Sequence, residues 1–361
     1  MSIASEITRI QDNISDAYTA AQAKGATMPA TQNSDNLATT ISTISGGGVD
    51  TTGWIRRNVD ANGKVVLPLI NGSDLGLSTI KDIGDYALQS VYRNRGNNNI
   101  VGLIDLSSLT AVTGNYALES CFYNCTGITS VDLSALNNIS GQYGLFNAFQ
   151  GCTGITSVDL SSLNTISGNN GMQNAFSGCT NLTSVDLSSL ISVTGQYGLF
   201  NAFQGCTSLT SVDLSALTTI SGSNSFNGAF SGCTGITSVD LSSLISVMGS
   251  DALRYAFQGC TSLTSMSFSA LNTITGSTSM NSAFKSCTGL TSLSFPALKS
   301  NSFGTYTNQF NNMIQGVTGC TIHFPSNLDP QTGSTVISGL SGYPNFGGTN
   351  TVLAFDLPAT E

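Results

Sequence analysis

Seven cysteines recur in this chain at intervals of 27 residues, and no other sequence feature restricts the fold as strongly. They are Cys125, Cys152, Cys179, Cys206, Cys233, Cys260 and Cys287. Each cysteine opens a unit that reads C-T-x-I/L-T-S-V-D-L-S-x-L-x-x-I/V-x-G-x-x-x-Φ-x-x-A-F-x-x, where Φ is Leu, Met or Phe. An earlier copy without the cysteine begins near Asn98. Such a strict period predicts a solenoid, because one unit cannot bury its apolar residues without a stacked neighbour.

The first half of each unit predicts a short β-strand. Ile128, Val131 and Leu133 follow an L-x-x-L-x-L spacing whose last three residues are expected to be extended. Because side chains alternate along a strand, Val131 and Leu133 should face inward and Asp132 outward. Stacked units would then pair these strands into a parallel sheet with a spacing of about 4.8 Å.

The second half of each unit predicts a helical turn. Leu145, Ala148 and Phe149 lie at positions i, i+3 and i+4, which is one face of a short helix, and Gly141 marks the turn before it. This helix is expected to pack against the interior of the coil. The phenylalanines at the equivalent position should stack as an internal spine, formed by Phe149, Phe176, Phe203, Phe230, Phe257 and Phe284.

Two motifs carry a family resemblance. The combination of A-F-x-G-C-T with L-T-S-V-D-L resembles the BspA-type (Treponema-type) leucine-rich repeat and extends from Asn98 to about Leu298. The resemblance implies an α/β repeat solenoid, a leucine-rich-repeat-like stack with one parallel strand and one helical turn per coil, over residues 98–299. The units are a few residues longer than that family's usual coil, and the extra residues fall around the G-x-x-x-Φ turn.

Residues 1–48 predict an N-terminal helical segment for attachment or oligomerisation. An a/d pattern of apolar residues runs through its first helix, at Ile7, Ile10, Ile14, Ala17 and Ala21. Isoleucine at both positions favours trimers or higher states, so residues 1–24 are a candidate homotrimer segment. A second short helix is expected at residues 36–44.

The same segment carries a second resemblance. Its pattern I-x-R-I-Q-x-x-I-x-x-A-Y-x-A-x-x-A-K-G-A-x-M-P resembles a short N-terminal module of phage and prophage tail and tail-fibre-associated proteins. The resemblance implies attachment to other tail proteins. Residues 49–97 are expected to form an N-terminal cap with a degenerate first coil, and residues 300–361 a C-terminal cap, because solenoids need atypical ends to cover the core.

The repeated cysteines raise the question of metal binding or disulfides. Zinc sites need ligands close together, as in C-x-x-C, and parallel Cβ vectors suit disulfides poorly. One cysteine per coil is better explained as a small buried hydrophobic residue. Cys121 occupies the position where other coils have alanine, which supports this interpretation. We therefore expect no metal and no cofactor.

An acidic ladder is expected on the outer face of the strands, at Asp105, Asp132, Asp159, Asp186, Asp213 and Asp240. Like charges about 5 Å apart repel by roughly 1 kcal/mol per pair in water, before screening. A solvated structural ladder whose carboxylates bond to flanking Ser and Thr is one interpretation. The other is a face that binds a cation or a cationic ligand.

Sequence variation between the coils concentrates in the predicted helical turn. Its outward positions supply the candidate ligand-binding residues Tyr116, Tyr143, Phe146, Tyr197, Phe200, Arg254 and Tyr255. Exposed aromatic and amide side chains are typical of recognition surfaces. Neutral drift on a solvated face would produce variation at the same positions.

Charge and composition exclude several functions. The net charge is −9, and no Lys or Arg occurs from Asn98 to Leu253, which argues against nucleic acid as a partner. The only histidine is His323, in the predicted cap, with no recurring catalytic spacing near it, and no phosphate-binding loop is present, so we expect no enzyme. No apolar stretch reaches membrane-spanning length, and no signal peptide is visible after Met1, so we expect synthesis in the cytoplasm.

These features together predict a non-enzymatic binding or adhesion protein. The leading hypothesis is a receptor-binding protein associated with a phage or prophage tail, whose solenoid recognises a protein or glycan on a bacterial surface. The alternative is a bacterial BspA-like cell-surface adhesin or a structural spacer. The first hypothesis predicts a virion location, and the second predicts an export route that the sequence does not show.

Overall fold

The computed structural model describes residues 70–93, 100–299, 302, 308–328 and 346–359. The chain divides into two units, Met1–Pro68 and Leu69–Glu361, and every described residue belongs to the second. The predicted N-terminal helices, the candidate homotrimer segment and the tail-like module lie outside the described residues.

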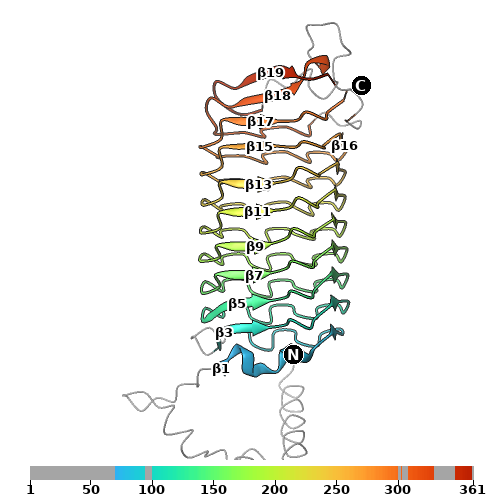
Figure 1. Cartoon of the computed structure of the whole chain (residues 1–361), viewed down its shortest axis with the longest axis vertical. Helices are drawn as coiled ribbons and strands as arrows, with labels where there is room; N and C mark the ends of the chain where they lie inside the picture. The colour runs from blue at the N-terminus through green and yellow to red at the C-terminus, as the bar shows by residue number, and fades with distance from the viewer. Residues whose placement is uncertain (1–69, 94–99, 300–301, 303–307, 329–345, 360–361) are drawn as a thin grey trace, which may run out of the picture. The chain divides into compact units, whose positions relative to one another are not determined.

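The second unit is a parallel β-solenoid in which each turn of the chain stacks on the one before (Figure 1). Its first sheet has seven parallel strands, one per coil. They are β1 (Ile70–Asn71), β3 (Ile100–Asp105), β5 (Ile128–Asp132), β7 (Ser157–Asp159), β9 (Ser184–Asp186), β11 (Ser211–Asp213) and β13 (Ser238–Asp240). The register from β5 onward keeps residues 27 apart directly opposite each other, so the sequence period is also the structural period.

A second parallel sheet of eight short strands forms another side of the coils. Its strands are β2 (Asp82–Ile83), β4 (Ala111–Val112), β6 (Asn138–Ile139), β8 (Thr165–Ile166), β10 (Ser192–Val193), β12 (Thr219–Ile220), β14 (Ser246–Val247) and β16 (Thr273–Ile274). The β-branched residue that ends each strand is buried, which fits the strand preference of such side chains.

The stack of the first sheet continues into a four-stranded parallel sheet, with β15 next to β13 (Figure 1). Its strands are β15 (Ser265–Ser267), β17 (Ser292–Ser294), β18 (Thr321–Pro325) and β19 (Val352–Leu357). The described helices are three short 3₁₀ turns, η1 (Gly72–Leu75), η2 (Leu77–Thr79) and η3 (Ser326–Leu328).

The predicted strand faces are confirmed. Val131 and Leu133 are buried, whereas Asp132 between them keeps contact with solvent. After the strand the chain turns a corner, closed by a hydrogen bond from the Leu136 N–H to the Leu133 carbonyl oxygen (2.9 Å). This corner carries the chain into the second sheet.

The third side of each coil differs from the predicted helical turn. No α-helix is present among the described residues, and residues 142–151 form a series of turns instead. The Ala148 N–H donates to the Leu145 carbonyl oxygen three residues earlier (3.1 Å), whereas the Leu145 N–H donates to the Gly171 carbonyl oxygen of the next coil (2.7 Å). The same alternation continues along the segment, so half of its amides join neighbouring coils.

The backbone of this side reverses its handedness at regular intervals. Tyr143, Asn147 and Gly151, four residues apart, have φ values of 56°, 54° and 73°. An α-helix would satisfy internally all its amides beyond the first turn and would leave too few donors for this alternating pattern of bonds to the next coil. The prediction of a helix was therefore wrong, although Leu145 and Phe149 are fully buried as the i, i+4 pattern indicated.

The predicted phenylalanine spine is confirmed. The rings of Phe149, Phe176 and Phe203 are fully buried and stack face to face, with centroids 5.2 and 5.6 Å apart. Stacking continues backward to Phe122 and forward to Phe284. The spine belongs to one continuous apolar core that crosses the coils.

The cysteines take the packing role that the sequence predicted. All nine are buried and none forms a disulfide. In the part of the chain that the structure describes, no group of three or more His, Cys, Asp or Glu side chains could hold a metal ion.

Candidate functional site

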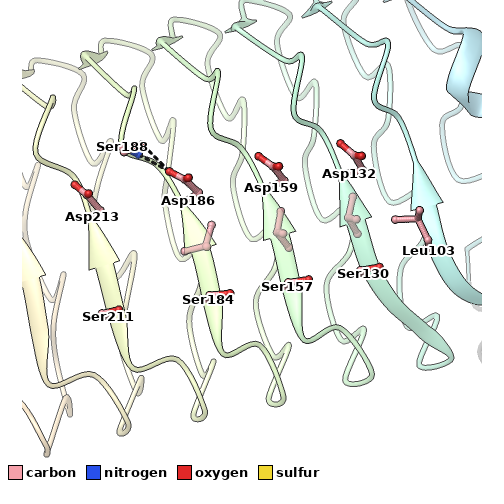
Figure 2. Close-up of a pocket in the computed structure, with 13 residues that line it drawn as sticks. Leu103, Ser130, Asp132, Ser157, Asp159, Ser184, Asp186, Ser188, Ser211 and Asp213 are labelled. Carbon is pink, nitrogen blue, oxygen red and sulfur yellow. Dashed lines mark hydrogen bonds between the residues drawn. The ribbon is translucent and has the colours of Figure 1, made fainter.

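Two surfaces of the solenoid carry the residues that the sequence singled out. The first is a groove over the first sheet, with a volume of about 660 Å³. Figure 2 shows its aspartates in one row and, in a second row, the serines two residues before them, Ser130, Ser157, Ser184 and Ser211. The carboxylates of Asp132, Asp159, Asp186 and Asp213 therefore lie in register along one side of the groove.

Each aspartate of the ladder is held by the chain that follows it. One carboxylate oxygen of Asp186 accepts hydrogen bonds from the N–H and the hydroxyl of Ser188, at 3.0 and 2.7 Å, which Figure 2 also shows. An equivalent bond from the serine N–H, at 2.9–3.0 Å, occurs in the other five coils. Hydrogen bonds of this kind stabilise the charged form. Those from Ser107 lower the pKa of Asp105, and those from Ser215 lower the pKa of Asp213.

The ladder ends at Asp240 in β13, the last strand of the first sheet. Ser267, Ser294 and His323 take the aspartate position in β15, β17 and β18. His323 contacts Asp356 through Nδ1, 2.9 Å from each carboxylate oxygen. The groove is thus a uniform acidic surface with each carboxylate bonded to its own turn.

The second surface is the series of turns on the third side of the coils, which we call the turn face. One position of the coil forms a column there, with φ between 52° and 59° in eight successive coils. The column contains Tyr86, Tyr116, Tyr143, Asn170, Tyr197, Asn224, Asp251 and Thr278. Left-handed backbone costs an ordinary L-residue roughly 1–2 kcal/mol, whereas Asn and Asp tolerate it better.

The tyrosines of this column stack where they are adjacent. The Tyr116 ring lies parallel to those of Tyr86 and Tyr143, with centroids 5.1 and 4.8 Å away. Tyr143 also meets the edge of Phe146, and two coils further Tyr197 meets Phe200 in the same T-shaped arrangement. Tyr86, 57% exposed, is a member of this cluster that the sequence analysis missed.

A pocket of about 320 Å³ opens on the turn face next to the second aromatic pair. It is lined by Phe200, Asn201, Gln204, Asn227, Gly228, Ser231, Arg254, Tyr255 and Gln258. The structure thus brings three of the predicted ligand-binding residues, Phe200, Arg254 and Tyr255, to one place. The other four predicted residues lie outside the pocket.

Arg254 is held in the wall of the pocket by its neighbours. Its guanidinium group lies over the Tyr255 ring, 4.8 Å from the centroid. Its terminal nitrogens donate to the Asp251 carboxylate at 3.3 Å and to the Tyr255 hydroxyl at 3.2 Å. These contacts fix the planar group and raise its pKa, with the hydrogen bond to Tyr255 as the largest cause.

Comparison with known families matches the chain to the BspA type leucine rich repeat region, in six copies over residues 119–253 and 201–329. No curated protein sequence matches the chain. In the part of the chain that the structure describes, no helix is long and apolar enough to span a bilayer.

The solved structures that match the chain do so at low identity and with low TM-scores. A chain of the Drosophila Toll–Spatzle complex is 15% identical, with a TM-score of 0.29 over 69% of this chain and 38% of its own length. An internalin from Listeria monocytogenes is 14% identical, with a TM-score of 0.24 over 70% of this chain and 74% of its own. A chain of a TLR13–ssRNA13 complex is 14% identical, with a TM-score of 0.19 over 76% and 49%. The chain thus spans well under half of the Toll chain that it matches.

Proposed function

The chain belongs to the BspA-type leucine-rich repeat family, and we propose that it is a non-enzymatic binding protein whose turn face contacts the ligand. Repeat solenoids of this type typically serve as binding scaffolds, and adhesion is consistent with the family. The stack presents the same position of successive coils at regular intervals, which suits a ligand bound through many weak contacts.

The backbone of the turn-face tyrosines is the observation that carries this proposal. Tyr116, Tyr143 and Tyr197 hold φ values of 56–57°, in a column where Asn170 and Asn224 occupy the same conformation at less cost. Bulky residues kept in a strained conformation point to a function that outweighs the cost in stability. The aromatic residues are also partly exposed, so their rings can contact a ligand.

More specifically, we propose that the chain is a receptor-binding protein of a phage or prophage tail. The tail-like pattern in residues 7–29 supports it, and the segment of residues 1–48 would attach to other tail proteins while the solenoid contacts a protein or glycan on the bacterial surface. A virion location follows from the same proposal. A bacterial surface adhesin and a structural spacer remain the alternatives.

Binding of the full-length chain to bacterial cells tests the proposal. The test variant replaces Tyr143 and Tyr197 by Asn, and Phe146 and Phe200 by Gln. Neighbouring coils carry these residue types at the equivalent positions, for example Asn170 and Gln173. We expect it to fold and to lose most of the binding. The matched control replaces Asp132, Asp159 and Asp186 by Asn on the acidic groove, and we expect it to bind normally. Normal binding by the turn-face variant, with loss in the control, would move the function to the groove.

The two settings are separated by particle association. A tail protein should co-purify with phage particles after induction and should be detected there by an antibody against the chain. Detection on the surface of uninduced cells would contradict the tail proposal and favour the adhesin.

A further inference from the structure

The pocket beside Phe200 exists because one coil departs from its neighbours. Asn147, Asn174 and Asn201 occupy the same left-handed position in three successive coils, with the Asn174 amide donating to Asn147 at 3.0 Å. The next coil has Gly228 there, and the one after it has Tyr255. Without a side chain at Gly228, a hollow opens between Phe200 on one side and Tyr255 on the other.

The lining of this pocket consists mostly of flat polar groups. Asn201, Gln204, Asn227 and Gln258 supply amides that both donate and accept hydrogen bonds. Phe200 and Tyr255 supply ring surfaces, and the lining contains no aliphatic side chain of Val, Leu, Ile or Met. Most small-molecule pockets have mainly apolar walls, so this composition favours a ligand rich in hydroxyl groups with one apolar face. A sugar ring has both properties.

The charge of the pocket is already balanced. Arg254 is the only Lys or Arg between Asn98 and Phe284, and its guanidinium is paired with Asp251 at 3.3 Å. An acidic ligand would have to compete with this carboxylate. A neutral hydroxyl oxygen can accept from the guanidinium without breaking the pair, because that group has five N–H donors.

We infer that the pocket formed by Phe200, Asn227, Gly228, Arg254 and Tyr255 binds one neutral sugar ring of a glycan. This inference rests on the proposed function and names the ligand class of the turn face. A volume of about 320 Å³ is at the lower end of the range for small-molecule sites, roughly 300–1,000 Å³, which fits a single ring with the rest of the glycan outside.

The test begins with the full-length chain and an array of neutral and uronic-acid-containing oligosaccharides, followed by calorimetric titration of those that bind. Gly228→Asn fills the pocket with the residue that the three preceding coils carry. The added Cβ would overlap the Asn201 side-chain oxygen, which can turn away, so we expect the variant to fold. Affinity for neutral oligosaccharides should fall about tenfold or more.

The chain offers a matched control for Phe200. Residues 142–152 and 196–206 have the same sequence, Q-Y-G-L-F-N-A-F-Q-G-C, and the same T-shaped aromatic pair. Of the two equivalent residues Phe146 and Phe200, only Phe200 lines the pocket. Phe200→Gln should weaken binding about tenfold, whereas Phe146→Gln should change it by less than about twofold.

Three outcomes would overturn the inference. One is the absence of neutral-oligosaccharide binding by a chain that still binds cells through the turn face, which leaves the proposed function standing. Another is equal loss in the Phe146 and Phe200 variants. The third is tighter, salt-sensitive binding of the uronic-acid oligosaccharides, which would identify an anion site. If every turn-face variant still bound cells normally, the proposed function itself would be contradicted.

Discussion

The thiol of Cys152 donates a hydrogen bond to the carbonyl oxygen of Phe122, 30 residues earlier, at 3.0 Å. The same bond joins Cys179 to Phe149 and recurs through Cys287 and Phe257, at 2.9–3.3 Å. A cysteine therefore fills a small buried space and also gives a second hydrogen bond to a carbonyl oxygen of the preceding coil, which already accepts from the Cys125 N–H at 3.0 Å in the case of Phe122. Alanine at the cysteine position would be smaller and would lack this additional bond between coils.

The buried thiols should be chemically inert in the folded protein. Burial raises the pKa of Cys179 and of Cys287 to about 12, and that of Cys320 to about 11. Because the thiolate is the reactive form, iodoacetamide at pH 8 should label the native chain slowly and label all nine cysteines after denaturation. Mass spectrometry of the labelled chain measures this. Stoichiometric labelling of the native chain within minutes would contradict the burial of these thiols.

The phenylalanine spine should dominate stability. Phe176→Ala removes a fully buried ring stacked on both sides, and we expect a loss of about 3–5 kcal/mol in the free energy of unfolding. Phe146→Ala, at a partly exposed ring of the turn face, should cost about 1 kcal/mol. Urea titration followed by circular dichroism compares the two variants. Equal losses would show that the spine is not the main source of stability.

A column of glycines sets how closely the coils approach. A Cβ at Gly195 would overlap the backbone carbonyl oxygen of Gly168, and the same overlap recurs at Gly222 and Gly249. Gly195→Ala must therefore push two coils apart, and we expect a cost of about 1–3 kcal/mol or more.

Gly205 provides the control for this column. It has a φ of 72° but no atom near the added Cβ, so Gly205→Ala should cost only the roughly 1–2 kcal/mol of left-handed backbone. Thermal unfolding of both variants separates steric overlap from backbone strain. A smaller loss in the Gly195 variant would refute the close-approach explanation.

The acidic ladder should make stability fall in acid. Bonds from Ser107 and Ser215 lower the pKa of Asp105 and Asp213 below the ordinary value of 3.8, so the folded state holds these protons less tightly than the unfolded state. Their contribution is therefore present above pH 3.8 and is lost as the pH falls through the folded pKa. NMR titration of the carboxyl carbons measures the shift, and Ser107→Ala should raise the pKa of Asp105 toward 3.8. A folded pKa above 3.8 would contradict this prediction, because the charged aspartate would then lower the stability of the folded state.

Much of the fold could be predicted from the sequence, because the repeat shows the same structural position several times and so reveals which residue types each position accepts. The inward Val131 and the stacking of Phe149 on Phe176 followed from spacing alone. The prediction of a helical turn was wrong, because side chains at positions i, i+3 and i+4 also face inward in a chain whose backbone reverses handedness every four residues. Asn147 and Gly151, both tolerant of positive φ at that spacing, were the signal that favours turns over a helix.

The candidate site could be predicted only in part. Sequence variation identified the aromatic residues and Arg254 of the turn face. It did not identify the pocket, because a hollow depends on which side chain is missing from a row. Gly228, which interrupts the asparagine row, was visible in the sequence, but its meaning required knowing that the row lies on the surface and that Phe200 and Tyr255 flank it.

Tyr197 provides the sharpest test of a trade-off between stability and function. Its φ of 57° costs roughly 1–2 kcal/mol, and the edge contact with Phe200 returns about 0.5–1.5 kcal/mol. Tyr197→Asn removes the ring contact and lowers the backbone cost, so the free energy of unfolding should change by between about −0.5 and +1.5 kcal/mol. Binding to cells should weaken, because the exposed ring is lost.

Chemical denaturation and a cell-binding assay on the same preparation measure the two effects, and Asn170→Gln at the equivalent position of the preceding coil serves as a control without an aromatic ring. A clear loss of stability in the Tyr197 variant would show that the tyrosine is retained for packing. Unchanged binding would remove the reason to assign function to this column, because the strained backbone would then have no ligand to explain it.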